Sequence, residues 1–326
     1  MFTLAARTTA EKLGLKMGRA NLDEFAGTLQ ELANSNPNII AVTSDSRGSG
    51  KLAPFGKALP RQLIEVGIAE QNLVGITAGL AACGKKPFGV SPGCFLTARS
   101  LEQLKNDICY SNVPAVLVGI SSGVSYGALG TTHHSLHDLA VLRAINNINI
   151  IVPADNFESR HAIVAAASAT KPVFVRFGKA AMYHLHKSDT KFEIGKAITL
   201  REGKDVAFLA NGETVIHAVL AAAQLATEGI QARVLSVHTV KPLDVAAILR
   251  AGRECRAVVT VEEHSVHGGV GEAVAATLLE AGVCKPFRRV GIPDEETVPG
   301  AQADIFRHYG ISMEGLAATA MTLLRA

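Results

Sequence analysis

Short, almost continuously apolar runs alternate with segments of helical period along most of the chain. The strand-like runs of the first half are 39–43, 115–120, 148–152 and 173–175. The helical segments between them are 22–34, 67–84, 98–111, 136–145 and 157–170. A strand that is hydrophobic at nearly every position is buried on both faces, so the pattern predicts a parallel sheet with helices on either side.

The alternation pauses and then resumes. Segment 182–191 is polar, rich in His and Lys and without a period, and is predicted to be an interdomain linker. The strands expected after it are 206–210, 234–237 and 257–261, and the helices are 213–228, 243–253, 271–281 and 313–324. We therefore predict two α/β domains, 1–187 and 188–326, each a mainly parallel sheet flanked by helices.

Composition excludes several function classes. A net charge of +3, evenly spread, gives no basis for nucleic-acid or membrane-surface binding. The start of the chain lacks the apolar core of a signal peptide, and no apolar run reaches the roughly 18 residues that span a bilayer. The five cysteines form no CxxC pair and show no metal-ligand spacing, which favours a reducing compartment. We expect a cytoplasmic protein.

Glu70 is the most informative single residue. It lies in the run Val-Gly-Ile-Ala-Glu-Gln-Asn, at the start of a helix that is otherwise small and apolar. A carboxylate in such surroundings is rarely buried without a partner. It is either a half-solvated group favoured by the helix dipole or a functional acid that shares a proton with a ligand nitrogen, and the spacing alone leaves both open.

Segment 130–138, Gly-Thr-Thr-His-His-Ser-Leu-His-Asp, is dense in side-chain chemistry. It follows the strand 115–120, at the end of a parallel sheet where α/β proteins bind ligands. Because no acidic or thiol ligand is suitably spaced from its three histidines, a polar substrate is favoured over a metal. Ser135 or Thr132 could instead cap the following helix, with Asp138 in its first turn.

Two further segments allow a functional and a purely structural interpretation. Segment 88–97 is predicted to be a strand followed by a flexible turn, in which Phe95 could stack on a flat ligand ring or belong to the core. The turn at Gly268 has the position of a dinucleotide fingerprint, but Val274 stands at the third glycine, so a tight turn is favoured.

Taken together, these segments resemble the C-terminal half of a transketolase. The matching features occur in the family's order, namely Glu70 in Gly-Ile-Ala-Glu-Gln-Asn, the Phe95 segment, Thr132-His133 and the run Ile-Ile-Val-Pro-Ala-Asp ending at Asp155. The resemblance covers about residues 9–324. It implies that the first domain binds the aminopyrimidine ring of thiamine diphosphate and that the second, a transketolase C-terminal domain, does not bind the cofactor directly.

The family's Gly-Asp-Gly…Asn signature, which holds Mg²⁺ and the diphosphate, does not occur in these 326 residues. The resemblance therefore implies one subunit of a split transketolase, whose diphosphate-binding half is a separate N-terminal subunit. No metal ligand is expected on this chain. By analogy with the family, the two kinds of chain would form an α₂β₂ heterotetramer with the coenzyme across their interface.

The resemblance also assigns cofactor contacts. Glu70 would hydrogen-bond the aminopyrimidine ring nitrogen as the catalytic acid–base group. Phe95 aligns with an aromatic residue that covers this ring. Ile68 and Gln71, beside Glu70 in the same motif, are the other expected cofactor contacts.

Four residues are expected at the sugar phosphate. His133 aligns with a histidine that contacts substrate hydroxyls near the reacting carbon. Lys179 falls where the family has an arginine for the phosphate, and keeps the charge but loses the bidentate fork. Ser49 and Arg47 could assist at the phosphate; alternatively, these loops are ordinary solvated surface.

Three departures from the family bear on specificity. Pro92 stands where many relatives have a first stacking aromatic, Leu129 replaces an aspartate that recognises a donor hydroxyl, and Ser121 replaces a histidine. A site that loses polar recognition groups loses discrimination at the matching hydroxyls. We therefore predict a branched, deoxy or otherwise modified sugar phosphate in place of the standard pentose phosphates.

The predicted reaction is transfer of a two-carbon ketol unit from a ketose phosphate to an aldehyde. The alternatives are the beta subunit of a 2-oxoacid dehydrogenase, an enzyme of the deoxyxylulose phosphate synthase type, and a catalytically inactive partner subunit. The Glu70 motif, Thr132-His133 and Lys179 favour sugar transfer. Loss of the aspartate at Leu129 mildly supports an inactive subunit, whereas the retained Glu70 opposes it.

Overall fold

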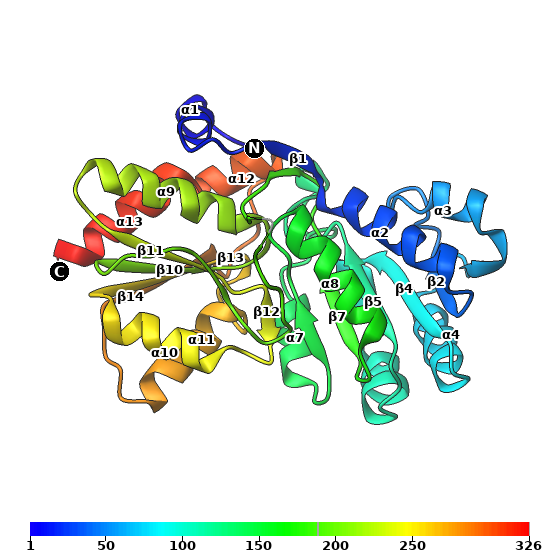
Figure 1. The fold of residues 1–326 in the computed structure, drawn as a ribbon. Helices are drawn as coiled ribbons and strands as arrows, with labels where there is room; N and C mark the ends of the chain where they lie inside the picture. The colour runs from blue at the N-terminus through cyan, green and yellow to red at the C-terminus, as the bar shows by residue number, and fades with distance from the viewer. Residues whose placement is uncertain (188, 326) are drawn as a thin grey trace.

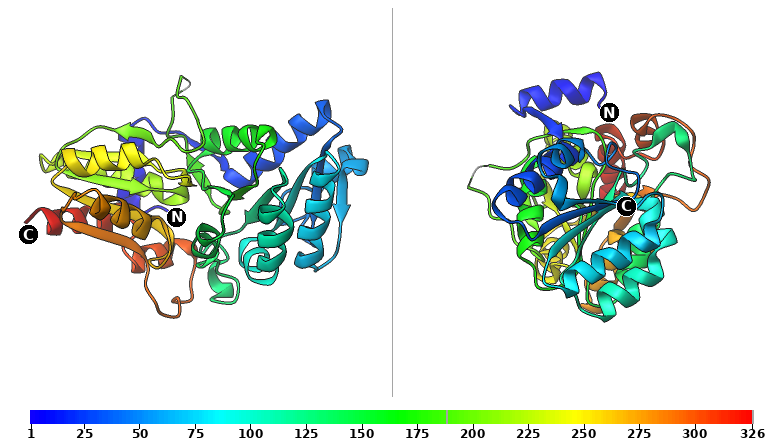
Figure 2. Two further views of the ribbon diagram at one scale, coloured as in Figure 1. Left: turned by 90° about the horizontal axis from the view of Figure 1, so that it is seen from below. Right: turned by 90° about the vertical axis from the view of Figure 1, so that its right-hand side faces the viewer.

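The computed structural model describes residues 1–187 and 189–325. Two α/β units lie side by side, one built mainly from the first half of the chain and the other from the second (Figures 1 and 2). Each has a central sheet with helices on both faces, so the predicted fold class is confirmed. Within the described ranges, no helix is long and apolar enough to cross a membrane.

The first sheet has seven strands in the order β12-β6-β7-β5-β4-β2-β3. All pair in parallel except β12, which runs antiparallel to β6 at the edge. The strands are β2 (Ile39–Thr43), β3 (Leu63–Glu65), β4 (Lys86–Pro92), β5 (Val116–Ile120), β6 (Asn149–Ile151), β7 (Val173–Arg176) and β12 (Thr239–Lys241).

Helices cover both faces of this sheet, because its strands are apolar at every central position. Residues of α2 (Asn21–Ser35) and α8 (Asn156–Ser168) form one core. Residues of α4 (Glu70–Ala82), η2 (Leu104–Tyr110) and α7 (Asp138–Ala144) form the other. The remaining short helices are α3 (Ala53–Ala58), η1 (Pro60–Gln62), α5 (Gly93–Arg99), α6 (Leu101–Gln103) and η3 (Gly127–Leu129).

The second sheet has five strands in the order β14-β13-β10-β11-β9, parallel except for β9 at one edge. Its strands are β9 (Ile198–Arg201), β10 (Val206–Ala210), β11 (Ala232–Ser236), β13 (Ala257–Ser265) and β14 (Phe287–Ile292). Its helices are η4 (Gly212–Thr214), α9 (Val215–Thr227), α10 (Val245–Glu254), α11 (Val270–Glu280), α12 (Gln302–His308) and α13 (Met313–Arg325). The N-terminal helix α1 (Leu4–Lys12) packs on this unit, against α9.

The segment after β4 differs from its prediction. A helix, α5, begins directly at Gly93, and there is no flexible turn. Pro92 has the extended backbone of a helix-preceding residue, and the Thr97 hydroxyl donates to the Gly93 carbonyl within the helix. The expected helix 98–111 is divided among α5, α6 and η2, and the expected helix 67–84 begins only at Glu70, after Gly67 at a φ of 72°.

Part of the predicted linker is firmly held. Met182 and Tyr183 belong to β8 (Ala181–Tyr183), which pairs with β1 (Met17–Ala20) in a small antiparallel sheet. The His186 imidazole is fully buried, with Nδ1 3.0 Å from Asp155 Oδ2 and Nε2 3.0 Å from Glu158 Oε1. A boundary near residue 187 stays a prediction.

The His186 ion pairs make stability sensitive to substitution there. Burial opposes the charge, but the two carboxylates outweigh burial and raise the pKa of His186 to about 10. Replacing His186 with Gln leaves both buried carboxylates uncompensated, so we expect unfolding in urea at pH 7 to cost about 3–5 kcal/mol less than in the wild type. His184→Gln, at an exposed position two residues earlier, is the matched control and should behave as wild type.

The same pairs predict a pH dependence of the wild-type protein. Because the folded-state pKa is raised above the ordinary value, the stabilisation is complete below about pH 6.5 and disappears as the pH rises through about 10. The free energy of unfolding should therefore decline between neutral pH and pH 10 more steeply in the wild type than in His186→Gln. Parallel curves for the two proteins would contradict the ion-pair assignment.

Candidate active site

The residues singled out from the sequence follow the carboxyl ends of neighbouring parallel strands. Ser49 follows β2, Glu70 follows β3, Phe95 follows β4, His133 follows β5 and Lys179 follows β7. These five strands are adjacent in the sheet, in the order β7-β5-β4-β2-β3. The topology therefore gathers the residues at one edge of the sheet, where open α/β sheets bind their ligands.

Backbone strain is concentrated in the same loops. Of the five non-glycine residues with positive φ in the described chain, three lie just after β2 or β5: Asp45, Lys51 and Ser121. Such conformations cost of order 1–3 kcal/mol and persist where the surroundings enforce them, often at functional sites. The strain thus marks the same edge of the sheet as the side chains do.

Glu70 is the first residue of α4 and is only 4 % exposed. Its two carboxylate oxygens accept from Arg99 Nη1, at 2.9 and 3.1 Å. Arg99 is the last residue of α5 and its side chain is half exposed. Glu70 is therefore buried with one charged partner and is not half solvated, and the sequence analysis did not identify that partner.

A depression of about 650 Å³ opens beside Glu70. Ile68 and Gln71 are both exposed and line it, together with Ala69, Asn72 and Arg99. The exposed Ile68 and Gln71 and the buried Glu70 thus line the same depression.

The Arg99 guanidinium also covers Phe95. Its central carbon lies 4.2 Å from the centroid of the Phe95 ring, a cation–π contact. The Arg99 guanidinium, a flat group with nitrogen donors, therefore stacks on Phe95 and donates to Glu70 at the same time. The two residues fit an aminopyrimidine ring, which is likewise flat and presents nitrogen atoms at its edge.

His133 joins this arrangement to the next loop. Its ring makes edge-on contacts with Phe95 and with Tyr126, at centroid distances of 5.4 and 5.3 Å. The Lys179 ammonium lies 3.8 Å from the centroid of the Tyr126 ring. Tyr126 was not predicted, because a single tyrosine in a glycine-rich loop gives no sequence signal.

Lys51 adds a second positive charge. Burial, and then the like charge of Lys51, hold the pKa of Lys179 below the ordinary lysine value. Lys51 belongs to the loop after β2 and lies 3.5 Å from Asp23. Arg47 and Ser49 are exposed in the same loop, where the Ser49 hydroxyl donates to the Ser46 carbonyl at 3.2 Å. The two loops together form a basic region suited to a phosphate.

The other histidines of the 130–138 segment have structural contacts. His134 is buried, with Nε2 donating to the Gly127 carbonyl at 2.9 Å and Nδ1 2.7 Å from the Thr297 hydroxyl. Burial lowers its pKa, consistent with a neutral ring. His137 Nε2 lies 3.1 Å from the Thr97 hydroxyl. In the described part of the chain, no group of three His, Cys, Asp or Glu residues could hold a metal ion.

Neither Ser135 nor Thr132 caps α7, so the capping alternative is wrong, whereas Asp138 does lie in the first turn as expected. The helix begins at Asp138, and its N-cap residue makes no side-chain cap bond. Arg176, the last residue of β7, binds the Asp138 carboxylate at 2.8 Å and the main-chain oxygens of Ser135 and Glu263 at 3.0 and 2.9 Å. Burial opposes ionisation of Asp138, but Arg176 and His264 outweigh it and lower its pKa.

Two buried acids of the second unit support the loops of the first. Gln302 Nε2 donates to both Glu213, at 2.9 Å, and Glu263, at 2.8 Å. Glu263 also accepts from the Val124 amide at 2.9 Å. Burial and their mutual repulsion raise the pKa of Glu213 to about 8, and burial raises that of Glu263 to about 7. At neutral pH the pair therefore retains a proton much of the time.

Glycine is required where these loops meet the acids. A Cβ atom at Gly123 would lie 2.2 Å from the Glu263 carboxyl carbon, and one at Gly178 would lie 2.2 Å from Glu213 Oε1. Gly178 directly precedes Lys179, and Gly123 opens the loop that carries Tyr126 and His133. The second unit therefore fixes the loops that bear the candidate substrate residues.

The glycine-rich turn at 268–271 is filled by the protein itself. Glu262 accepts from the amides of Val270 and Gly271 at 2.7 and 2.8 Å, at the start of α11. An internal carboxylate thus takes the place that a phosphate has in a dinucleotide site. This contact supports the predicted tight turn, because it occupies amides that a nucleotide phosphate would need.

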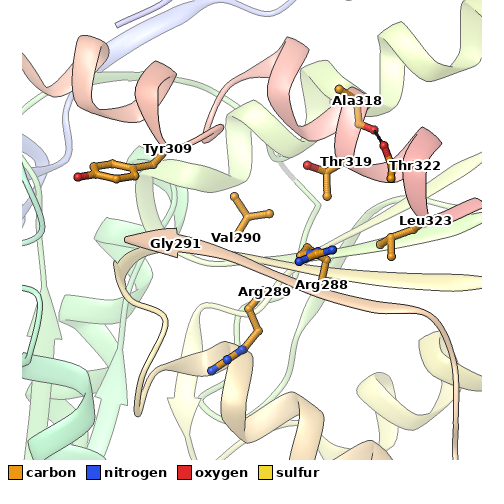
Figure 3. Close-up of a pocket in the computed structure, with 9 residues that line it drawn as sticks. All are labelled: Arg288, Arg289, Val290, Gly291, Tyr309, Ala318, Thr319, Thr322 and Leu323. Atoms are coloured by element: carbon orange, nitrogen blue, oxygen red, sulfur yellow. Dashed lines mark hydrogen bonds between the residues drawn. The ribbon is translucent and has the colours of Figure 1, made fainter. Parts of the chain in front are cut away.

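A separate depression of about 430 Å³ lies between β14 and the helices α12 and α13 (Figure 3). Its lining includes Arg288, Tyr309 and Thr319, while Arg289 extends away toward the opposite side of the strand. None of the residues selected from the sequence lines it.

Comparison with known proteins agrees with this geometry. Residues 20–183 match the family model of the transketolase pyrimidine binding domain, and residues 195–316 match that of the transketolase C-terminal domain. The chain is 49 % identical over 302 residues to an apulose-4-phosphate transketolase subunit of Phocaeicola vulgatus, covering 92 % of this chain and 96 % of that one.

Two further relatives are informative. A 6-deoxy-6-sulfo-D-fructose transketolase subunit of Clostridium sp. (strain MSTE9) is 38 % identical over 273 residues, which are 83 % of this chain and 84 % of that one. A solved structure described as a split gene transketolase in an inactive beta4 tetramer superposes with a TM-score of 0.84 at 34 % identity, covering 94 % and 99 % of the two chains. The chain therefore belongs to the transketolase family, of which it carries the pyrimidine-binding and C-terminal domains.

Proposed function

We propose that this chain is the C-terminal subunit of a two-chain transketolase, which transfers a two-carbon ketol unit from a modified ketose phosphate to an aldehyde acceptor. The observation that carries the proposal is one unbroken series of contacts along the edge of the sheet. It runs from Glu70 through Arg99, Phe95, His133 and Tyr126 to Lys179. A carboxylate suited to a ring nitrogen and an ammonium suited to a phosphate are thus joined in one site.

At the cofactor end, Glu70 would hold the proton shared with the aminopyrimidine nitrogen, and Phe95 would cover the ring. Ile68 and Gln71 would border it at the opening of the depression. A ring nitrogen has to compete with Arg99 for the Glu70 carboxylate. Bound thiamine diphosphate supplies an electron sink for cleavage of the bond next to the ketose carbonyl.

At the substrate end, His133 would bind hydroxyls near the reacting carbon, and Lys179 would bind the phosphate. Lys51, and then Arg47 and Ser49, would complete the phosphate site from the loop after β2. A 2-oxoacid substrate has no phosphate, so the two neighbouring lysines favour sugar transfer over the dehydrogenase alternative.

A modified sugar is supported by the departures from the family. Leu129 is 57 % exposed at the aspartate position, Ser121 replaces a histidine at the end of β5, and the buried Pro92 ends β4. Two relatives are named for an apulose phosphate and for a sulfofructose, neither of which is a standard pentose phosphate donor.

The proposed assembly places Mg²⁺ and the diphosphate mainly on an N-terminal partner subunit, within an α₂β₂ heterotetramer. The absent Gly-Asp-Gly…Asn signature supports this division. The proposed domain boundary, 1–187 and 188–326, falls between the two family-model matches. The five free thiols favour a cytoplasmic enzyme.

Glu70→Ala tests the catalytic assignment. Loss of acid–base help at the ring nitrogen should lower turnover by about 10²–10⁴, while the thermal unfolding temperature changes little. Turnover is measured with a ketose phosphate after mixing with a Gly-Asp-Gly partner chain. Glu102→Ala, an exposed acid on a nearby helix, is the control. Turnover near that of the wild type in Glu70→Ala would rule out the assigned role.

Lys179 predicts a pH dependence of substrate capture. Because its pKa is lowered, its positive charge disappears at a lower pH than that of an ordinary lysine. We expect kcat/KM for a phosphorylated donor to fall as the pH rises through that value, and Lys179→Arg to remain flat over the same range because a guanidinium stays charged. Unphosphorylated ketose is the control substrate, and identical profiles for both proteins would contradict the phosphate role.

A substrate panel tests the modified-sugar proposal. Apulose 4-phosphate, 6-deoxy-6-sulfofructose and xylulose 5-phosphate are compared as donors for the reconstituted pair, with pyruvate as the donor of the rival reaction. We expect apulose 4-phosphate to have the highest kcat/KM. Xylulose 5-phosphate with ribose 5-phosphate as the best pair would contradict the modified-sugar proposal.

Calorimetry tests the proposed division of the cofactor site between two chains. Thiamine diphosphate and Mg²⁺ are titrated into this chain alone and into its mixture with the partner chain, and we expect tight binding only in the mixture.

A further inference from the structure

Tyr126 lies between the two candidate substrate-binding side chains. Its ring makes an edge-to-face contact with the His133 ring at a centroid distance of 5.3 Å, and the Lys179 ammonium lies over its face, 3.8 Å from its centroid. A single aromatic ring therefore separates the group that would recognise the carbonyl end of a donor from the group that would bind its phosphate.

The backbone holds this ring in place. Tyr126 directly precedes η3, where the Leu129 amide donates to the Tyr126 carbonyl at 3.3 Å and the Gly127 amide donates to the Val124 carbonyl at 2.8 Å. The Val124 amide is in turn held by Glu263. Burial raises the pKa of Tyr126, and the nearby Ser121 hydroxyl partly opposes this shift, so the phenol is neutral.

The surroundings of the ring have lost polar recognition groups. Ser121, with a short side chain, stands beside the phenol, and the exposed Leu129 follows on the same turn as Tyr126. The turn that carries Tyr126 therefore presents an aromatic ring and an exposed aliphatic side chain. Such a surface suits a short carbon skeleton better than a long polyhydroxy chain.

We propose that Tyr126 is a specificity-determining residue: its ring holds Lys179 close to His133 and thereby selects compact ketose phosphates over longer linear ones. This inference rests on the proposed transketolase function and specifies the substrate class of the same site. Attraction between the ammonium and the ring favours the position of Lys179 over Tyr126, and a longer donor requires Lys179 to leave that position.

The test compares two linear donors that differ in length, erythrulose 4-phosphate and xylulose 5-phosphate. Wild type, Tyr126→Phe and Tyr126→Ala are each assayed with the partner chain and one fixed aldehyde acceptor. We expect the wild type to favour the four-carbon donor. In Tyr126→Ala the ratio of kcat/KM values should shift toward the five-carbon donor by about tenfold, through KM and with kcat little changed.

Tyr126→Phe keeps the ring and removes only the hydroxyl, so its ratio should stay within about twofold of the wild type. Unphosphorylated erythrulose cannot use Lys179, and its KM should be the same in all three proteins. An unchanged ratio in Tyr126→Ala, or an equal shift in Tyr126→Phe, would overturn the role of the ring.

Failure of the underlying function gives a different result. If the wild-type mixture turns over no ketose phosphate and binds no thiamine diphosphate, the proposed function is wrong and the inference falls with it. If the wild type is active and prefers the five-carbon donor, the function stands and the selection of compact donors is wrong. Thermal unfolding of each variant verifies that the compared proteins are folded.

Discussion

The site depends on one buried cation, Arg176. It ends β7, an interior strand of the first sheet, and binds the Asp138 carboxylate, the Ser135 carbonyl and the Glu263 carbonyl. These three partners belong to the start of α7, the histidine-rich loop and the second sheet. A buried guanidinium requires such complete pairing, because an unpaired charge in the interior costs several kcal/mol. The same side chain therefore fixes both the contact between the two α/β units and the position of the loop after β5.

The buried acids Glu213 and Glu263 also position the loops of the first unit. Glu213 and Glu263 lie against the backbones of Gly178 and Gly123, and Gln302 donates to both carboxylates. Two carboxylates this close cannot both be ionised without strong repulsion, which is why their pKa values rise toward neutrality. The second α/β unit thus contributes no side chain to the series of contacts from Glu70 to Lys179. Its buried acids nevertheless determine the positions of the loops that carry Tyr126, His133 and Lys179.

At the other end of the contact series that runs from Glu70 to Lys179, Arg99 contacts both Glu70 and Phe95. It pairs with the buried Glu70 carboxylate and stacks on the Phe95 ring. A half-exposed arginine can leave this position at modest cost, since ion pairs of partly exposed groups contribute little. The carboxylate and the aromatic ring are thus held ready for a flat ligand without being sealed from it.

Patterns in the sequence were enough to predict the α/β class and most of the strands, and they singled out Glu70 as a candidate. Apolar runs such as 39–43 are local signals, and a carboxylate at the start of an apolar helix can be recognised without any contact. Only the folded chain reveals that β12 joins the first sheet, that His186 is buried between Asp155 and Glu158, and that Lys51 and Tyr126 lie near Lys179. The sequence around His186, Lys51 and Tyr126 contains no motif that would have pointed to these contacts. Each acquires its role from a residue far along the chain, and only the packing of the two sheets brings such residues together.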